Sequence, residues 1–535
     1  MKIKSLIVVF VFSFSSLLAQ STDPKADSAQ TAPSNWFNLD AEQYLVQGVS
    51  TEKAYEFLQG KKSSKVVVAV IDSGVDIEHE DLQGKIWVNA DEIPGNNKDD
   101  DNNGYIDDVH GWNFIGGKDG THVGHDTYEL TREYVRLKEK YEGVSLDDIP
   151  KKEKEYYTHI LDEFDKKRAE MEQQYSGFQF FAKSYKRSSK LLEAYLDVEE
   201  VTNELLGDIE TEDEIVLTSV SIMEYALSMG FSKDQFQEYE DYYTNALEYG
   251  YNPDFDPRYI VGDNYEDLSE KYYGNNDVNG PDSRHGTHVA GIIAANRNNT
   301  LGMQGIADNV EIMAIRAVPD GDERDKDIAN AIYYAVDNGA QVINMSFGKS
   351  YSPQKEAVDQ AVKYAESKGV LLVHAAGNSS EDIDEMPNFP SRNFADSRKE
   401  AENWIEVGAS SWKSEAQFVV EVANYVKATL DGFAPGVAVY APTPGQKYEN
   451  LSGTSMASPV TAGVAALILS YYPALKAEQV KEIILDSTVK LGDLKVSLPG
   501  EEDRLVSFDM LSRTGGVVNA YEAVKLAESY QIKMK

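Results

Sequence analysis

The sequence predicts an α/β domain with a mostly parallel sheet, helices on both faces and an inserted all-helical subdomain. First, residues 65–71 (KVVVAVI) form an unbroken β-branched run, which is typical of a strand buried on both faces. Second, strand and helix patterns alternate after about residue 309, as in βαβ units. Third, apolar residues recur at helical spacing between about residues 120 and 279, amid many Glu and Lys residues.

The elements follow from runs of apolar residues and their spacing. Strands are expected at 310–318, 341–347, 370–376 and 404–409, and helices at 325–338, 354–368 and 476–487. A short helical pattern covers 36–59. The uncharged run from Ala457 to Leu469 predicts a helix that is enclosed on all sides.

The insertion is expected to begin with a helix. Asp126 and Glu129 have the spacing of a capping box, and Leu130 and Leu137 lie on one face of the helix that follows. Further helices are expected around 190–206, 214–229 and 233–249. A long charged coil is the alternative, which the regular apolar stripes disfavour.

Composition excludes several classes of function. The chain carries 90 Asp and Glu against 51 Lys and Arg, a net charge of −39, which disfavours nucleic acid and anionic membranes as partners. It has no cysteine, so disulfides, thiol catalysis and cysteine-bound zinc are excluded. Residues 1–19 have the charged start, short apolar centre and small-residue end of a cleavable signal peptide. A membrane anchor is the alternative, but the apolar run is short for a span. We expect an exported protein without a membrane span.

Four polar residues stand where catalytic groups occur in other proteins. Ser455 precedes the enclosed helix, where free backbone N–H groups face an anion, although a helix-capping serine is the alternative. His285 begins another small-residue helix and could act as a general base. Asp72 follows a buried strand, at the edge where α/β sheets place their active crevices. Asn378 ends another buried strand and could donate to an oxyanion, although a plain turn residue is the alternative.

A zinc site formed by His285 and His288 is the alternative to a general base at His285. His288 falls within the apolar helix and is expected to be a packed core residue. The His285-Gly-Thr-His288 spacing lacks the glutamate of the HExxH zinc motif, so a zinc pair is disfavoured.

These segments resemble the subtilisin-like serine proteases, the subtilases. The motifs are DSG at 72, HGTHVAG at 285, AAGN at 375 and GTSMASP at 453, in the family's order. The resemblance implies a subtilisin-like fold with Asp72, His285 and Ser455 as catalytic triad and Asn378 in the oxyanion hole. It also implies that Ser346, Phe347 and Gly348 form a wall of the substrate cleft, to which an extended peptide could add as a strand.

Two calcium sites are expected. The acidic loop DDDNNGYIDD at 99–108 resembles the start of an EF-hand loop, with Asp99, Asp101, Asn103 and Asp108 as candidate ligands. An acidic surface turn without metal is the alternative. The segment 297–303 resembles a second calcium loop of the family, where Asn299 would combine with Asp81.

The sequence therefore predicts an exported serine endopeptidase.

 We expect residues 1–19 to be signal peptide, 20–45 a flexible lead, 46–119 and 280–531 the discontinuous peptidase domain, and 120–279 the helical insertion, which is expected to limit or select substrates. The protein is expected to be monomeric and to act on a protein or peptide. Two alternatives stay open: a catalytically silent binding protein that presents the insertion to a partner, and an esterase.

Overall fold

The computed structural model describes residues 32–413, 415–420 and 422–534 of the chain. The predicted signal peptide and residues 20–31 of the predicted lead lie outside the described residues.

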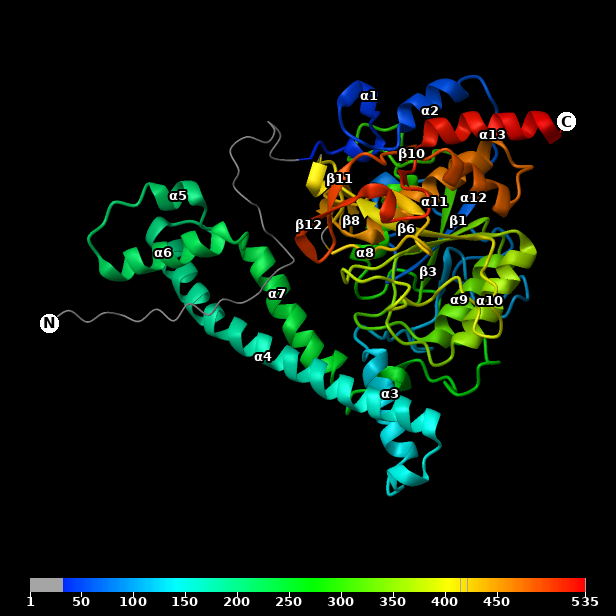
Figure 1. Ribbon diagram of the computed structural model, residues 1–535. Coiled ribbons are helices and arrows are strands. Elements are labelled where there is room, and N and C mark those ends of the chain that lie inside the picture. Colours follow the sequence, from blue (N-terminus) through cyan, green and yellow to red (C-terminus); the bar gives the residue numbers. More distant parts are fainter. Residues whose placement is uncertain (1–31, 414, 421, 535) are drawn as a thin grey trace. The chain divides into compact units, whose positions relative to one another are not determined.

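A nine-stranded sheet forms the centre of the larger compact unit (Figure 1). Its order is β10-β13-β7-β6-β5-β4-β1-β3-β2, and all neighbours are parallel except the antiparallel pair β10 and β13. The strands are β1 (Val66–Asp72), β2 (Gly111–Asn113), β3 (Val310–Arg316), β4 (Val342–Met345), β5 (Leu371–Ala375), β6 (Trp404–Ser410), β7 (Gly432–Pro435), β10 (Val489–Lys490) and β13 (Gly516–Val517). The predicted mostly parallel sheet is confirmed.

Helices cover both faces of this sheet. Alternate residues of β1 enter different cores: Val66, Val68 and Val70 join one, and Ala69 and Ile71 join the other. The first core contains α2 (Thr51–Leu58), α8 (Arg284–Ala294), α11 (Thr454–Tyr471), α12 (Ala477–Asp486) and α13 (Ala520–Met534). The second contains α9 (Asp325–Asp337) and α10 (Lys355–Lys368). The strand β1 is therefore buried on both faces, as its β-branched run predicts.

The central helix α11 is the most enclosed of these helices. Of the described helices, it alone is by itself long and apolar enough to cross a membrane, and 89% of its 18-residue window is buried inside the protein. This burial is typical of the core helix of an α/β domain. Short elements complete the unit: η1 (Trp36–Asn38), α1 (Ala41–Tyr44), and the hairpins β8 (Val439–Thr443) with β9 (Lys447–Leu451) and β11 (Lys495–Leu498) with β12 (Glu501–Ser507).

The predicted insertion is divided between two compact units. Residues 120–171 and 245–279, which we call the insertion root, belong to the same unit as the sheet. The root contains α3 (Glu129–Lys140), the first part of α4 (Lys151–Leu196), a π-helical turn (Ala246–Gly250) and η5 (Pro257–Ile260). Leu130 and Leu137 of α3 pack with Ile160 and Phe164 of α4, as the helical spacing predicts.

The predicted capping box at the start of α3 is wrong. The N-cap residue is Tyr128, which makes no side-chain cap hydrogen bond. The Asp126 carboxylate instead accepts two hydrogen bonds from the buried Arg324 guanidinium, at 2.8 and 2.9 Å. A buried cation binds a carboxylate more strongly than a backbone N–H does, so the ion pair takes Asp126 away from the helix.

Residues 172–244 form the second compact unit, which we call the outer helices. They comprise the remainder of α4, α5 (Asn203–Gly207), α6 (Glu214–Ser228) and most of α7 (Lys233–Asn245). Stacked aromatic rings form their core, with Tyr185 and Phe236 centred 4.1 Å apart. The helix predicted at 190–206 is wrong in its bounds, because α4 runs on to Leu196 and α5 is a separate short helix.

Candidate active site

Two of the predicted site residues meet at the carboxyl end of the sheet. Asp72 is the last residue of β1, and His285 lies in the first turn of α8. Nδ1 of His285 lies 2.7 Å from Oδ1 of Asp72, which also accepts the Ser73 N–H at 2.8 Å. Gly286 permits this approach, because a Cβ there would lie 2.1 Å from the Gly74 carbonyl oxygen. The pair joins residues 213 positions apart in the sequence.

The environment of the pair favours a basic imidazole. Asp72 is 2% exposed, whereas the His285 side chain is partly exposed. Burial acts to lower the pKa of His285, but the Asp72 carboxylate acts more strongly with its hydrogen bond, and the pKa is raised above its usual value. The imidazole is thereby oriented with Nε2 directed away from Asp72, where it could accept a proton.

His288 is a packed core residue, as predicted. It is fully buried, and its Nε2 lies 3.0 and 3.1 Å from the carbonyl oxygens of Val439 and Glu449. Burial lowers its pKa to about 3, so the ring is neutral and donates to these carbonyls.

Ser455 is held at the start of α11 against the end of β4. Its hydroxyl donates to the carbonyl oxygen of Ser346 at 3.1 Å, and its own carbonyl oxygen accepts the Ser346 hydroxyl at 2.8 Å. Among the described residues, no hydrogen bond joins Ser455 to His285 in this structure. The first link of the predicted triad is therefore present, and the Ser455 hydroxyl is bonded to Ser346.

Asn378 lies beside the residue that precedes Ser455. Its Oδ1 accepts hydrogen bonds from the backbone N–H and the hydroxyl of Thr454, at 2.9 and 3.1 Å. Because the Thr454 N–H can only donate, these contacts fix the orientation of the Asn378 amide, with Oδ1 toward Thr454. Nδ2 is then the group that can donate to a ligand. Asn378 is exposed, so this amide is accessible.

The predicted substrate wall follows β4. Ser346 is buried, Phe347 is partly buried and Gly348 is exposed. The next residue, Lys349, is fixed by the insertion root: its Nζ lies 2.7 Å from Oε2 of Glu129 and 2.8 Å from Oδ1 of Asp325. All three side chains are buried. The wall is thus connected to α3 through one buried ammonium group.

The insertion root also runs beside the segment that follows β3. Asp126 N–H donates to the Asp320 carbonyl oxygen, and Asp320 N–H donates to the Gly124 carbonyl oxygen, each at 2.9 Å. The Asp322 carboxylate accepts the Glu129 N–H at 2.8 Å. These contacts extend the carboxyl edge of the sheet with residues of the root.

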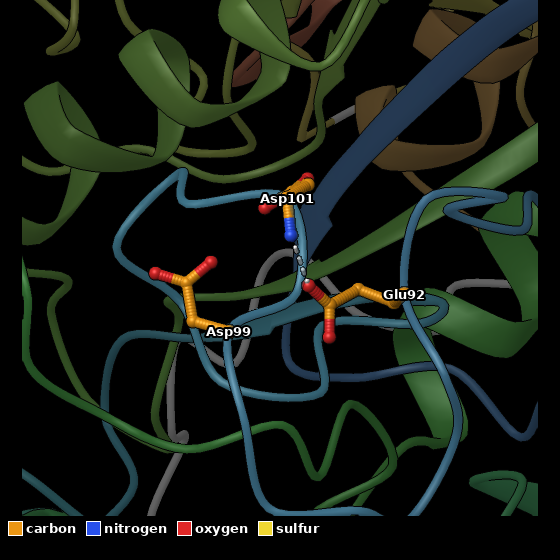
Figure 2. A group of neighbouring side chains, drawn as sticks. All are labelled: Glu92, Asp99 and Asp101. Atoms are coloured by element: carbon orange, nitrogen blue, oxygen red, sulfur yellow. Dashed lines mark hydrogen bonds between the residues drawn. The ribbon is translucent and has the colours of Figure 1, made fainter.

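Two carboxylates of the acidic loop and one that precedes it lie close together (Figure 2). Glu92, Asp99 and Asp101 each offer an oxygen, and these oxygens lie within 4.8 Å of one another. Oε1 of Glu92 accepts the Asp101 N–H at 3.3 Å, and the buried Oε2 has no hydrogen-bond partner among the described residues. Carboxylate oxygens in a turn with a free buried acceptor fit Ca²⁺, which binds six to eight oxygens.

The other two predicted ligands of this loop lie beside the cluster. Asn103 donates through Nδ2 to Asp101 and Asp108, at 3.1 and 3.0 Å. Asp108 is fully buried, and it accepts hydrogen bonds from Asn89 at 3.0 Å and from the Tyr334 hydroxyl at 2.6 Å. Burial raises its pKa to about 6 against the effect of these donors. Asp108 is thus held by three protein donors, and Glu92, which the sequence analysis did not name as a ligand, lies with Asp99 and Asp101.

The second predicted calcium pair is brought together by the fold. Asn299 donates through Nδ2 to Oδ1 of the buried Asp81 at 2.7 Å, and the Met303 N–H donates to Oδ2 at 3.3 Å. Both carboxylate oxygens of Asp81 thus accept hydrogen bonds from the protein. This pair therefore has fewer free oxygens for binding a cation than the acidic loop has.

Two residues that support the site were missed by the sequence analysis. Glu92 lies seven positions before the acidic run, and a carboxylate flanking such a run is the signal that could have identified it. Arg316 is 2% exposed and donates to the carbonyl oxygens of Ser73 and Val123 at 2.8 and 2.6 Å. It fixes the turn after Asp72, and only the pairing of β1 with β3 brings it there.

Comparisons with known proteins identify the family of this chain. A sequence model described as the Subtilase family matches residues 216–500. Subtilisin DY of Bacillus licheniformis is 42% identical over 221 residues, which cover 41% of this chain and 74% of the relative. Subtilisin BL of Lederbergia lenta is 38% identical over 211 residues, which cover 39% of this chain and 71% of the relative.

Two further matches differ in extent. The thermophilic serine proteinase of Bacillus sp. (strain AK1) is 39% identical over 220 residues, which cover 41% of this chain and 49% of the relative. The solved structure titled proteases from Pseudoalteromonas arctica PAMC 21717 aligns with 19% identity and a TM-score of 0.45, covering 93% of this chain and 100% of that chain.

Proposed function

This chain belongs to the subtilase family of serine endopeptidases, and we propose that Asp72, His285 and Ser455 form its catalytic triad. The hydrogen bond between Asp72 and His285 is the observation that carries this proposal. It holds the imidazole in one tautomer, with the proton on Nδ1 and a free Nε2.

The proposed reaction proceeds through an acyl-enzyme. Nε2 of His285 takes the Ser455 hydroxyl proton as the oxygen attacks the scissile carbonyl, and it then gives that proton to the leaving amine. Water repeats the sequence and releases the acid. Asp72 stays ionised throughout and stabilises the imidazolium that forms in each step.

Asn378 and the start of α11 would stabilise the oxyanion. Nδ2 of Asn378 is the free donor of its amide, since Thr454 occupies Oδ1. The Ser455 backbone N–H at the start of α11 is the second proposed donor, at the positive end of the helix dipole.

Ser346, Phe347 and Gly348 are proposed to bind the peptide on the acyl side of the cut. An extended peptide can add to the end of β4 as a further strand, with its backbone paired to these residues. The insertion, predicted at 120–279, is proposed to limit or select substrates, and the contact of Lys349 with Glu129 supports its influence on the wall.

A fluorophosphonate probe tests the triad directly. The full chain is expected to be labelled on Ser455, and the Ser455→Ala and His285→Ala variants are expected to remain unlabelled. The Ser452→Ala variant is a matched control, because it removes an exposed hydroxyl three residues before the nucleophile and keeps the nucleophile. Absence of labelling in a folded wild-type protein would favour a silent binding protein, and cleavage of esters without cleavage of peptides would favour an esterase.

We also propose a structural Ca²⁺ ion in the acidic loop, with Glu92, Asp99 and Asp101 as ligands. The ion would neutralise carboxylates that otherwise repel one another, and it would stabilise the turn without taking part in the reaction. The site predicted at Asp81 and Asn299 stays a second proposal. Export through the predicted signal peptide at 1–19 is proposed as well.

A further inference from the structure

A second histidine lies buried behind the substrate wall. His374, on β5, is fully buried, and its Nε2 lies 2.9 Å from the carbonyl oxygen of Phe347, the middle residue of the wall. Its Nδ1 lies 2.8 Å from Oε1 of Glu406. His374 and Glu406 are register partners on the neighbouring parallel strands β5 and β6, so the sheet itself fixes the pair.

Both atoms that contact this imidazole are hydrogen-bond acceptors. A carbonyl oxygen can only accept, and the remaining oxygen of Glu406 already accepts the Trp404 indole N–H at 2.7 Å. A neutral imidazole has one N–H and could satisfy one of the two contacts. Because imidazole is a stronger base than a carboxylate, the proton that completes the second contact belongs on His374.

Further charged groups lie behind Glu406. The buried Asp431 accepts the Glu406 N–H at 2.9 Å and is ion-paired with the buried Arg392. Arg513 lies 3.6 Å from Asp431 but pairs more closely with Glu400, at 3.0 Å, and Lys481 also acts on Asp431. These cations face Asp431, and Glu406 is the carboxylate that contacts His374.

The strand partner and the aromatic neighbours of the imidazole carry no charge. Met345 of β4 is its register partner, and the Trp404 and Phe347 rings are centred 5.2 and 6.4 Å from it. Glu406 is therefore the group that directly balances a charge on His374.

We propose that the Glu406–His374 ion pair is a positioning device for the substrate wall. The imidazolium holds the Phe347 carbonyl inward, and because successive backbone groups of an extended strand alternate in direction, the groups on either side are left to face a peptide. The identity of the wall rests on the proposed function, whereas the protonation of His374 does not.

Nitrogen NMR tests the protonation of His374 without relying on activity. The full chain with Ser455→Ala, labelled with ¹⁵N only in its eight histidines, is compared with the same chain carrying His374→Asn to assign the signals. At neutral pH, both ring nitrogens of His374 are expected to carry protons. A bare nitrogen on His374 in the folded protein would overturn the proposal.

Kinetics of the Glu406→Gln variant test the link to the wall. Loss of one charge-assisted hydrogen bond is expected to raise KM for a six-residue peptide about tenfold, while kcat/KM for a small ester that does not reach the wall changes less than about twofold. The control is Asp359→Asn, an isosteric change at a buried carboxylate that accepts the Ala395 N–H at 2.7 Å away from the wall. Equal losses on both substrates, or no change in either, would refute the positioning role. If the wild type cleaves neither substrate, the proposed function fails, and the NMR result still decides the ion pair.

Discussion

Glu323→Gln is expected to stabilise the protein at neutral pH. Glu323 is 2% exposed, and its Oε1 has no hydrogen-bond partner among the described residues. Burial raises the pKa of this carboxyl to about 8, although Lys349 acts to lower it, and the negative charge of Asp322 raises it further. The folded protein therefore carries Glu323 protonated at neutral pH, whereas the unfolded chain carries it ionised.

The sign and size of the effect follow from proton binding. Above the unfolded pKa of about 4.5, the unfolded state binds fewer protons at this site than the folded state, so stability falls as the pH rises. The loss is about 1.4 kcal/mol per pH unit and ends near the folded pKa. At pH 7 the wild type should thus be about 3 kcal/mol less stable than a variant that cannot ionise there.

The measurement is urea unfolding at several pH values between 4 and 9. Wild type and Glu323→Gln are both prepared with Ser455→Ala, so that self-cleavage cannot distort the curves. The difference in the free energy of unfolding should be near zero at the acidic end, should grow through pH 5 to 8, and should then level off. Glu356→Gln serves as the control for loss of a carboxylate on the exposed end of α10. A difference that does not change with pH would refute the protonated state of Glu323.

Three further predictions concern the proposed chemistry. Asp72→Asn should lower kcat roughly 10⁴-fold, the loss that follows the same exchange in a well-studied serine protease, because the imidazole then adopts the wrong tautomer; peptide hydrolysis measures it. Asn378→Ala should lower kcat by about 10²–10³ with little change in KM, as removal of the oxyanion asparagine does in subtilisin itself. Removal of calcium by a chelator should lower the melting temperature, and at a free concentration about 100 times the Kd the ion should contribute about 2.7 kcal/mol.

Each of these has its own control. Asp76→Asn changes another carboxylate shortly after β1 and should leave kcat within about tenfold, which separates the role of Asp72 from a general charge effect. A change in KM without a change in kcat would contradict the oxyanion role of Asn378. Asp101→Asn should remove the response to calcium, and an unchanged response would exclude the acidic loop as the site.

The buried strands, the buried helices and the motif residues could be predicted, because local sequence patterns mark them. The uncharged β-branched run of β1 and the small-residue starts of α8 and α11 predict buried strands and helices, and the motifs around Asp72 and His285 predict their meeting across 213 positions. The pairing of buried charges was not predictable, since Asp126 binds Arg324 at a distance of 198 positions and no local pattern marks such a partner.

Glu92 and Asp108 illustrate the same limit at the proposed metal site. Both are acidic residues near one turn, and their spacing does not tell which one faces the cluster. The structure separates them, because Tyr334 of α9 donates to Asp108, and Glu92 keeps an unused oxygen. Which carboxylate keeps an oxygen free for the proposed ion is decided by a helix more than 200 residues away.

The division between the insertion root and the outer helices determines how this protein could be re-engineered. Removal of residues 120–279 would leave Arg324 without Asp126 and Asp327 without Arg258. Because these buried charges would lose their counterions, the peptidase domain is expected to unfold. Cutting within 172–244 removes a unit with its own aromatic core and spares those pairs. The outer helices can therefore be exchanged as a unit. Chimaeras that carry the corresponding helices of another protein on the insertion root should still fold.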